Sequence, residues 1–76
     1  MTCFLRVGND YLEDAERHAT KADAIAAFAE TARELARYDQ RIEATLHYAA
    51  NRDELQEYPD FVLSLGPRGG IRCERC

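Results

Sequence analysis

Three cysteines and two histidines are the side chains of this sequence best suited to metal binding or nucleophilic chemistry. Cys73 and Cys76 have the Cys-x-x-Cys spacing of half a zinc site. The remaining ligands would have to come from Cys3 with His18 or His47. However, a second Cys-x-x-Cys is absent, and an extended strand would point positions 73 and 76 to opposite faces. We therefore predict no metal site, and we expect Cys3 and Cys73 to be small buried core side chains.

A catalytic arrangement is not indicated elsewhere in the chain. A Cys–His nucleophilic pair needs a group that orients the histidine and a turn that binds the oxyanion, and the sequence indicates neither. We predict that His18 and His47 are surface side chains. The segment Gly66–Gly70 joins two predicted strands rather than a strand and a helix, so it is predicted to be a turn and not a phosphate-binding loop. The sequence therefore predicts a protein that is not an enzyme and binds no cofactor.

Carboxylates are concentrated in two predicted loops, at residues 9–19 and 49–60. Tyr11 and Tyr58 lie among them, and a ring in that position is typical of an interface anchor and equally of a cap on a small core. Two interpretations of the loops stay open, a solvated surface that keeps the protein soluble or a surface that binds a basic partner. The residues predicted to bind that partner are Asp10, Tyr11, Glu13, Asp14, Glu16, Asp53, Glu54, Glu57 and Asp60.

Length and composition restrict the class of protein. Seventy-six residues are expected to form a single α+β domain, 1–76, and 46% apolar with 32% charged residues is typical of a globular fold. The net charge of −4 disfavours direct nucleic-acid binding, which needs a basic face. The apolar runs are too short to span a bilayer, and no secretory signal is indicated, so we expect a cytoplasmic protein with reduced thiols and no membrane partner.

The pattern of apolar residues predicts an α+β fold, in which one amphipathic helix packs on a small, mostly antiparallel sheet in the order β-α-β-β-β. Strands are expected at residues 2–7, 41–48 and 61–65 and from Ile71 onward, and a helix capped by Thr20 is expected at 21–38. A right-handed crossover should make the first two strands parallel. The two acidic loops would then share one end of the sheet and form an acidic pole.

One resemblance follows from these features together. The chain has a single acidic domain, a strand–helix–antiparallel-sheet plan around the helix that begins Thr20-Lys21-Ala22-Asp23-Ala24-Ile25, and no catalytic motif. In this it resembles small accessory proteins of phages and mobile elements, including several anti-CRISPR proteins. The resemblance implies a non-enzymatic inhibitor in a bacterial host cell, which blocks a basic DNA-binding surface of a CRISPR-Cas complex.

Two other functions stay open at this point. The chain would be a small zinc-binding or regulatory protein if Cys73 and Cys76 bound metal, with Arg68, Arg72 and Arg75 placed to contact nucleic acid. Alternatively, it would be a subunit of a homo-oligomer that uses the outward strand face of Thr45 and His47 as its contact. The preferred partner is a basic protein or nucleoprotein complex.

Overall fold

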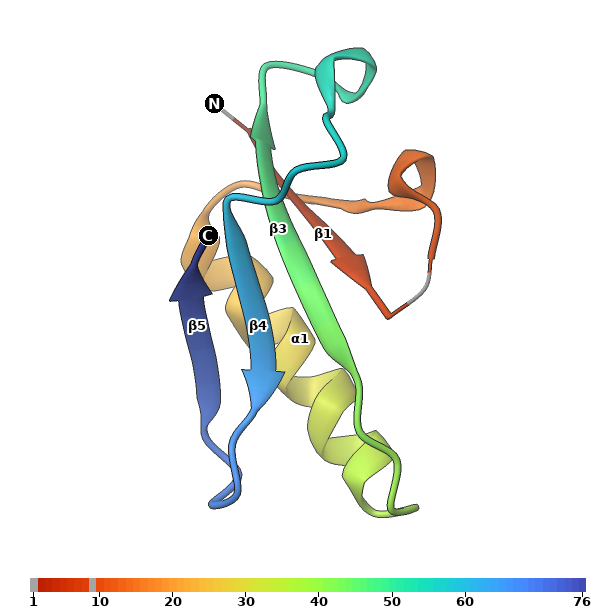
Figure 1. Cartoon of the computed structure of the whole chain (residues 1–76), viewed down its shortest axis with the longest axis vertical. Helices are drawn as coiled ribbons and strands as arrows, with labels where there is room; N and C mark the ends of the chain where they lie inside the picture. The colour runs from red at the N-terminus through yellow and green to blue at the C-terminus, as the bar shows by residue number, and fades with distance from the viewer. Residues whose placement is uncertain (1, 9) are drawn as a thin grey trace.

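The computed structural model describes residues 2–8 and 10–76, so Asn9, within the predicted loop 9–19, lies outside the described residues. Its elements, in chain order, are β1 (Thr2–Val7), η1 (Leu12–Asp14), β2 (Glu16–His18), α1 (Lys21–Ala36), β3 (Glu43–Ala49), η2 (Arg52–Glu54), β4 (Phe61–Leu65) and β5 (Ile71–Arg75). The strands of the described chain form one antiparallel sheet in the order β2-β1-β3-β4-β5, and α1 crosses one face of it (Figure 1). The predicted α+β class is confirmed.

The prediction that the first two strands are parallel is wrong. β1 pairs with β3 in an antiparallel register, with Val7 opposite Ala44 and Thr2 opposite Ala49. The reason is β2, a three-residue strand that is too short and too polar to show in the apolar pattern and that pairs antiparallel with β1. Because β2 and β3 both run opposite to β1, the parallel crossover joins β2 to β3 through α1 and passes over β1.

α1 begins and ends at recognisable local signals. The backbone N–H of Asp23 donates to Thr20 Oγ1 at 3.1 Å, which confirms the predicted N-cap. The helix ends at Ala36, two residues before the predicted end at 38, because Asp39 takes the left-handed conformation with φ of 58°. The N–H of Gln40 then reaches back to the Leu35 carbonyl at 3.1 Å, as in a Schellman motif.

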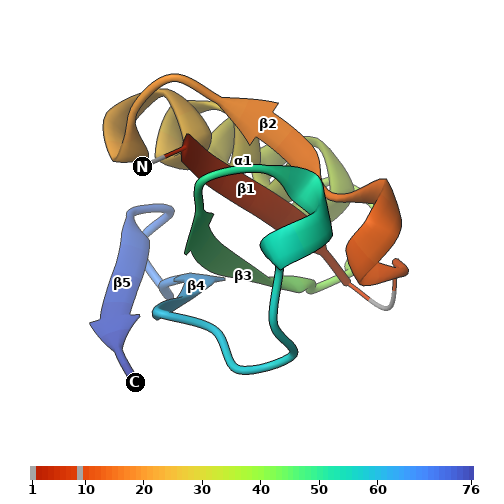
Figure 2. The same ribbon diagram turned by 90° about the horizontal axis from the view of Figure 1, so that it is seen from above.

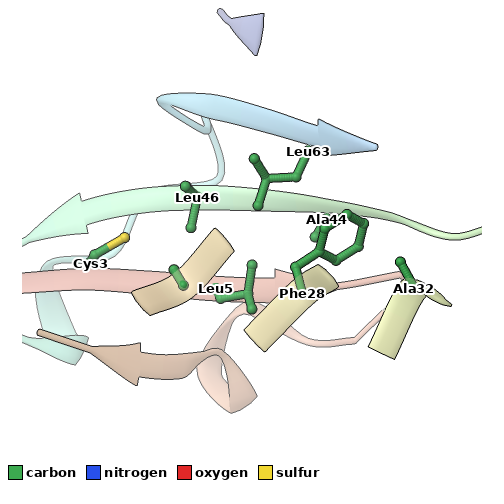
Figure 3. Packing of buried hydrophobic residues seen from close by; sticks show 8 residues of the cluster. Cys3, Leu5, Phe28, Ala32, Ala44, Leu46 and Leu63 are labelled. Carbon is green, nitrogen blue, oxygen red and sulfur yellow. The ribbon is translucent and has the colours of Figure 1, made fainter. Parts of the chain in front are cut away.

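The main core lies between α1 and the sheet (Figure 3). Small side chains on the helix, Ala24 and Ala32, flank Phe28 and let the helix approach the strands closely. The strands contribute Cys3, Leu5, Ala44, Leu46 and Leu63, all of them buried. Along β1 and β3 these core residues lie at alternate positions, as expected for strands that pack one face against a helix.

The opposite face of the sheet is also covered. Phe4, Ala15 and Ala49 are buried in a second, smaller cluster against which Leu55 packs. Ala15 follows η1 and Leu55 follows η2, so the segments that cover this face are the two acidic loops. Each loop therefore has an apolar side toward the sheet and a charged side toward solvent.

We predict that Phe28→Ala lowers the free energy of unfolding by about 3–5 kcal/mol, since it removes a fully buried aromatic side chain from a small core. Urea denaturation followed by circular dichroism measures the change. Glu30→Ala, at an exposed position of the same helix, is the control and should change stability by less than about 0.5 kcal/mol. Equal effects of the two substitutions would contradict the assignment of Phe28 to the core.

Candidate functional site

Arg52 joins the two acidic loops. Its Nη1 donates to the backbone carbonyls of Glu13 and Ala15, both at 2.7 Å, and its guanidinium lies 5.3 Å from the centroid of the Phe4 ring. The Asn51 side chain accepts from the Glu54 N–H at 3.2 Å and caps η2, which fixes the turn that carries Arg52. Figure 2, seen from above, shows η1 and η2 on the same side of β1. The loops therefore meet over the sheet through a charged hydrogen-bond donor.

The loops meet for a different reason than the sequence predicted. In the antiparallel β1–β3 pair they leave from opposite ends, the first after Val7 and the second after Ala49, so the expectation of a shared end is wrong. Both loops instead fold back over the face that carries Phe4. Their meeting point is thus the middle of a sheet face, not a pole.

The carboxylates of this surface are exposed and largely unpaired. We define the acidic loop surface as the exposed carboxylates Asp10, Glu13, Asp14, Asp53, Glu54 and Glu57. Among residues 2–8 and 10–76, an ion pair reaches this set only at Glu57, 3.8 Å from Arg6. Arg52 donates to main-chain carbonyls rather than to these side chains. A shallow depression of about 470 Å³ between the loops is lined by Glu13 and Asp53, together with Leu12, Arg52 and Leu55.

Two predicted binding residues have other roles. Glu16 lies opposite Leu5 on β2, so its side chain is on the α1 face, where Oε1 lies 3.1 Å from Nε2 of His18. Asp60 accepts a hydrogen bond from the Tyr48 N–H at 2.8 Å, and its own N–H donates to the Leu46 carbonyl at 2.7 Å. Glu16 is therefore outside the acidic loop surface, and Asp60 fixes the end of the second loop.

The two loop tyrosines are exposed. Tyr11 is 74% exposed and Tyr58 is 88% exposed, so neither ring caps the core. These exposed fractions do not fit rings that cap the core; they fit rings that remain accessible beside the carboxylates. They provide apolar area that a partner can cover.

The prediction that both histidines are surface side chains is wrong. His47 is 1% exposed, because the loop after β3 folds over it. Its Nδ1 lies 2.9 Å from the Gln56 carbonyl and its Nε2 lies 2.8 Å from Thr45 Oγ1. A carbonyl can only accept, so Nδ1 carries the proton and the Thr45 hydroxyl donates to Nε2. The side chain of His18 is 12% exposed, because the unpredicted strand β2 lies beside α1.

His47 is therefore not accessible for the oligomer contact considered at Thr45 and His47, because residues of the same chain cover its side chain. The same arrangement also changes the acid–base behaviour of the imidazole. Burial lowers the pKa of His47, and Arg6 acts in the same direction, while the Gln56 carbonyl and Asp60 oppose the shift. The neutral form therefore holds the second loop against the sheet.

The thiols do not converge. Cys3 is 1% exposed, as predicted, and burial with the added effect of Asp60 raises its pKa against the opposing effect of Lys21, which makes it a poor nucleophile. Cys73 is half-buried and Cys76 is exposed. Within the described residues, no three cysteine, histidine or carboxylate side chains are grouped as metal ligands. In the same part of the chain, no helix is long and apolar enough to cross a bilayer.

Comparisons of the chain with protein-family models, with curated proteins and with solved structures give no match. The residues of the chain are therefore the basis for any functional assignment.

We predict that Arg52→Ala lowers the free energy of unfolding by about 1.5–3 kcal/mol, the usual value for hydrogen bonds to a charged group, and speeds amide hydrogen exchange in η1. Hydrogen-exchange mass spectrometry of residues 12–15 measures the local effect. Arg68→Ala removes the same charge at the exposed hairpin and should leave exchange in η1 unchanged. If both variants behave alike, Arg52 does not tie the loops.

We predict that stability falls as the pH drops below about 6.5, where an unfolded histidine takes up a proton and the buried His47 does not. The stabilisation that comes from the lowered pKa of His47 is fully present above that pH, and it is lost as the pH falls to the pKa of the folded state. Urea denaturation between pH 7.5 and 5 measures it. His47→Gln should flatten this dependence and His18→Gln should preserve it; the reverse result would contradict the assignment.

Proposed function

We propose that this chain is a non-enzymatic binding protein that docks its acidic loop surface on a basic surface of another protein or nucleoprotein complex. The proposal rests on the hydrogen bonds that Arg52 donates to backbone carbonyls of the first loop. Because its guanidinium binds the carbonyls of Glu13 and Ala15, the positive charge between the two loops holds them together and leaves Glu13 and Asp53 exposed for a partner.

Electrostatics favour this type of docking. Like charges gathered in two adjoining loops repel each other, and a basic partner would relieve the repulsion while speeding encounter at low salt. Tyr11 and Tyr58 add exposed aromatic rings of the kind that carry much of the binding energy in interfaces. The loops are also preorganised, since Arg52 and His47 hold them in place before a partner arrives.

The partner class that we propose, from the sequence resemblance, is a CRISPR-Cas complex in the cytoplasm of a bacterial host cell. The channel of such a complex holds nucleic-acid phosphates with lysine and arginine side chains. A rigid carboxylate surface is a chemically suitable competitor for that channel. The chain would then inhibit by occupying the site where target DNA enters.

We predict that Glu13→Lys/Asp53→Lys abolishes capture of the partner. The immobilised protein is incubated with lysate from bacteria that express CRISPR-Cas complexes, at 50 mM and 500 mM salt, and the retained proteins are identified by mass spectrometry. A basic partner held at low salt and released at high salt is expected. A gel-shift assay with purified complex and labelled target DNA then tests whether the chain displaces DNA.

The matched control is Glu30→Lys/Glu34→Lys, which makes the same change in net charge at exposed positions of α1, away from both loops. Capture should survive in this variant. Loss in both variants would mean that overall charge and not the loop surface governs binding. Capture that ignores salt and the loop substitutions would overturn the docking proposal, and capture without loss of DNA binding would overturn its CRISPR-Cas part alone.

A further inference from the structure

β5 forms one edge of the sheet, beyond β4. The Gly66 N–H donates to the Gly70 carbonyl at 2.7 Å, and the Cys76 N–H donates to the Asp60 carbonyl at 3.1 Å. Gly66 and Gly70 are therefore a hydrogen-bonded pair, and so are Asp60 and Cys76. Along an antiparallel pair of strands, hydrogen-bonded pairs alternate with non-hydrogen-bonded pairs. The even-numbered residues of β5 therefore direct their backbone groups to β4.

The odd-numbered residues, Ile71, Cys73 and Arg75, direct their N–H and C=O groups away from the sheet. Among the described residues, no strand pairs with this edge. Open edges of this kind are templates for another strand. The other edge of the sheet is less open, because β2 has only three residues and leads at once into the turn before α1.

We propose that β5 pairs with β5 of a second copy of this chain, antiparallel and with Cys73 opposite Cys73 on the two-fold axis. The pairing uses the backbone groups of the odd-numbered residues and joins the two sheets into one. Because the two strands are related by a two-fold axis, the contact is self-complementary and closes at two copies.

Charge complementarity selects this register. With Cys73 on the axis, Arg72 of each copy lies opposite Glu74 of the other, at non-hydrogen-bonded positions where facing side chains are closest. A shift of one pair in one direction puts Arg72 opposite Arg72, and the opposite shift puts Glu74 opposite Glu74. Within one copy, the side chains of Arg72 and Glu74 already lie 2.9 Å apart, so the two pairs would join into a network of four charges.

Apolar surface supports the same contact. α1 packs chiefly against β1 and β4, and Figure 2 shows β5 standing clear of the helix. Ile71 and Cys73 lie on the α1 face of the sheet but are only half-buried. A two-fold axis perpendicular to the sheet keeps both helices on one face, so the two Cys73 side chains would meet, and the Arg75 stem of each copy would lie over Ile71 of the other.

The first test is site-specific cross-linking with a short bifunctional maleimide. In the proposed register the two Cys73 Cα atoms are about 5.5 Å apart, as in any hydrogen-bonded antiparallel pair. The two Cys76 residues are about 20 Å apart, at three residues on each side of the axis. Cys76→Ser, which keeps Cys73, should therefore cross-link as a dimer, and Cys73→Ser, which keeps Cys76, should not. Cys3 is buried in both variants.

The second test measures the dimer dissociation constant by analytical ultracentrifugation. Arg72→Glu places like charges opposite each other at both pairs and should weaken association by about tenfold or more. Arg72→Glu/Glu74→Arg exchanges the charges and should restore it. Both side chains are exposed, so circular dichroism should show an unchanged fold. A wild-type chain that stays monomeric at millimolar concentration, or a dimer that cross-links through Cys76 and ignores the charge substitutions, would overturn the proposal.

Discussion

The structure depends on covering both faces of a thin sheet when the described residues form a single long helix. α1 covers one face, and the other, which carries Phe4 and His47, has to be covered by the connections between strands. Two polar side chains make this possible. Arg52 draws the first loop over the sheet through carbonyl groups, and His47 holds the second loop through the Gln56 carbonyl. Without them, Phe4 would face solvent.

The same two side chains explain why the acidic surface has a defined shape. Carboxylates in neighbouring loops repel each other, and loops held only by apolar contacts of small side chains such as Ala15 and Ala49 would separate readily. The hydrogen bonds from Arg52 go to the backbone, so they fix where the loops lie without neutralising individual carboxylates. The contacts that cover the core therefore also hold the charged side chains in place at the surface.

A pattern of apolar residues can predict only those elements that are long enough to show a period, and this limited how much of the structure was predicted. α1, β1, β3, β4 and β5 each have enough residues for a period to emerge, and each was predicted within two residues or so. β2 has three residues and no such period, and its omission led to the wrong parallel pairing. His47 was assigned to the correct face, but alternation along a strand cannot show that a loop from the same chain covers that face. The role of Arg52 depends on carbonyls 37 and 39 positions away.

The net charge of −4 restricts where two copies can approach each other. The acidic loop surface repels its own counterpart, whereas residues 66–76 include Arg68, Arg72 and Arg75 and a single carboxylate side chain, that of Glu74. Contact between the acidic loops of one copy and this basic region of another would be heterologous and would continue from copy to copy. Self-pairing of β5 places Arg72 of each copy against Glu74 of the other in a closed contact and leaves both acidic surfaces free. In that dimer the two acidic surfaces lie on the same side of the joined sheet, so a partner with two basic sites would be bound by both at once.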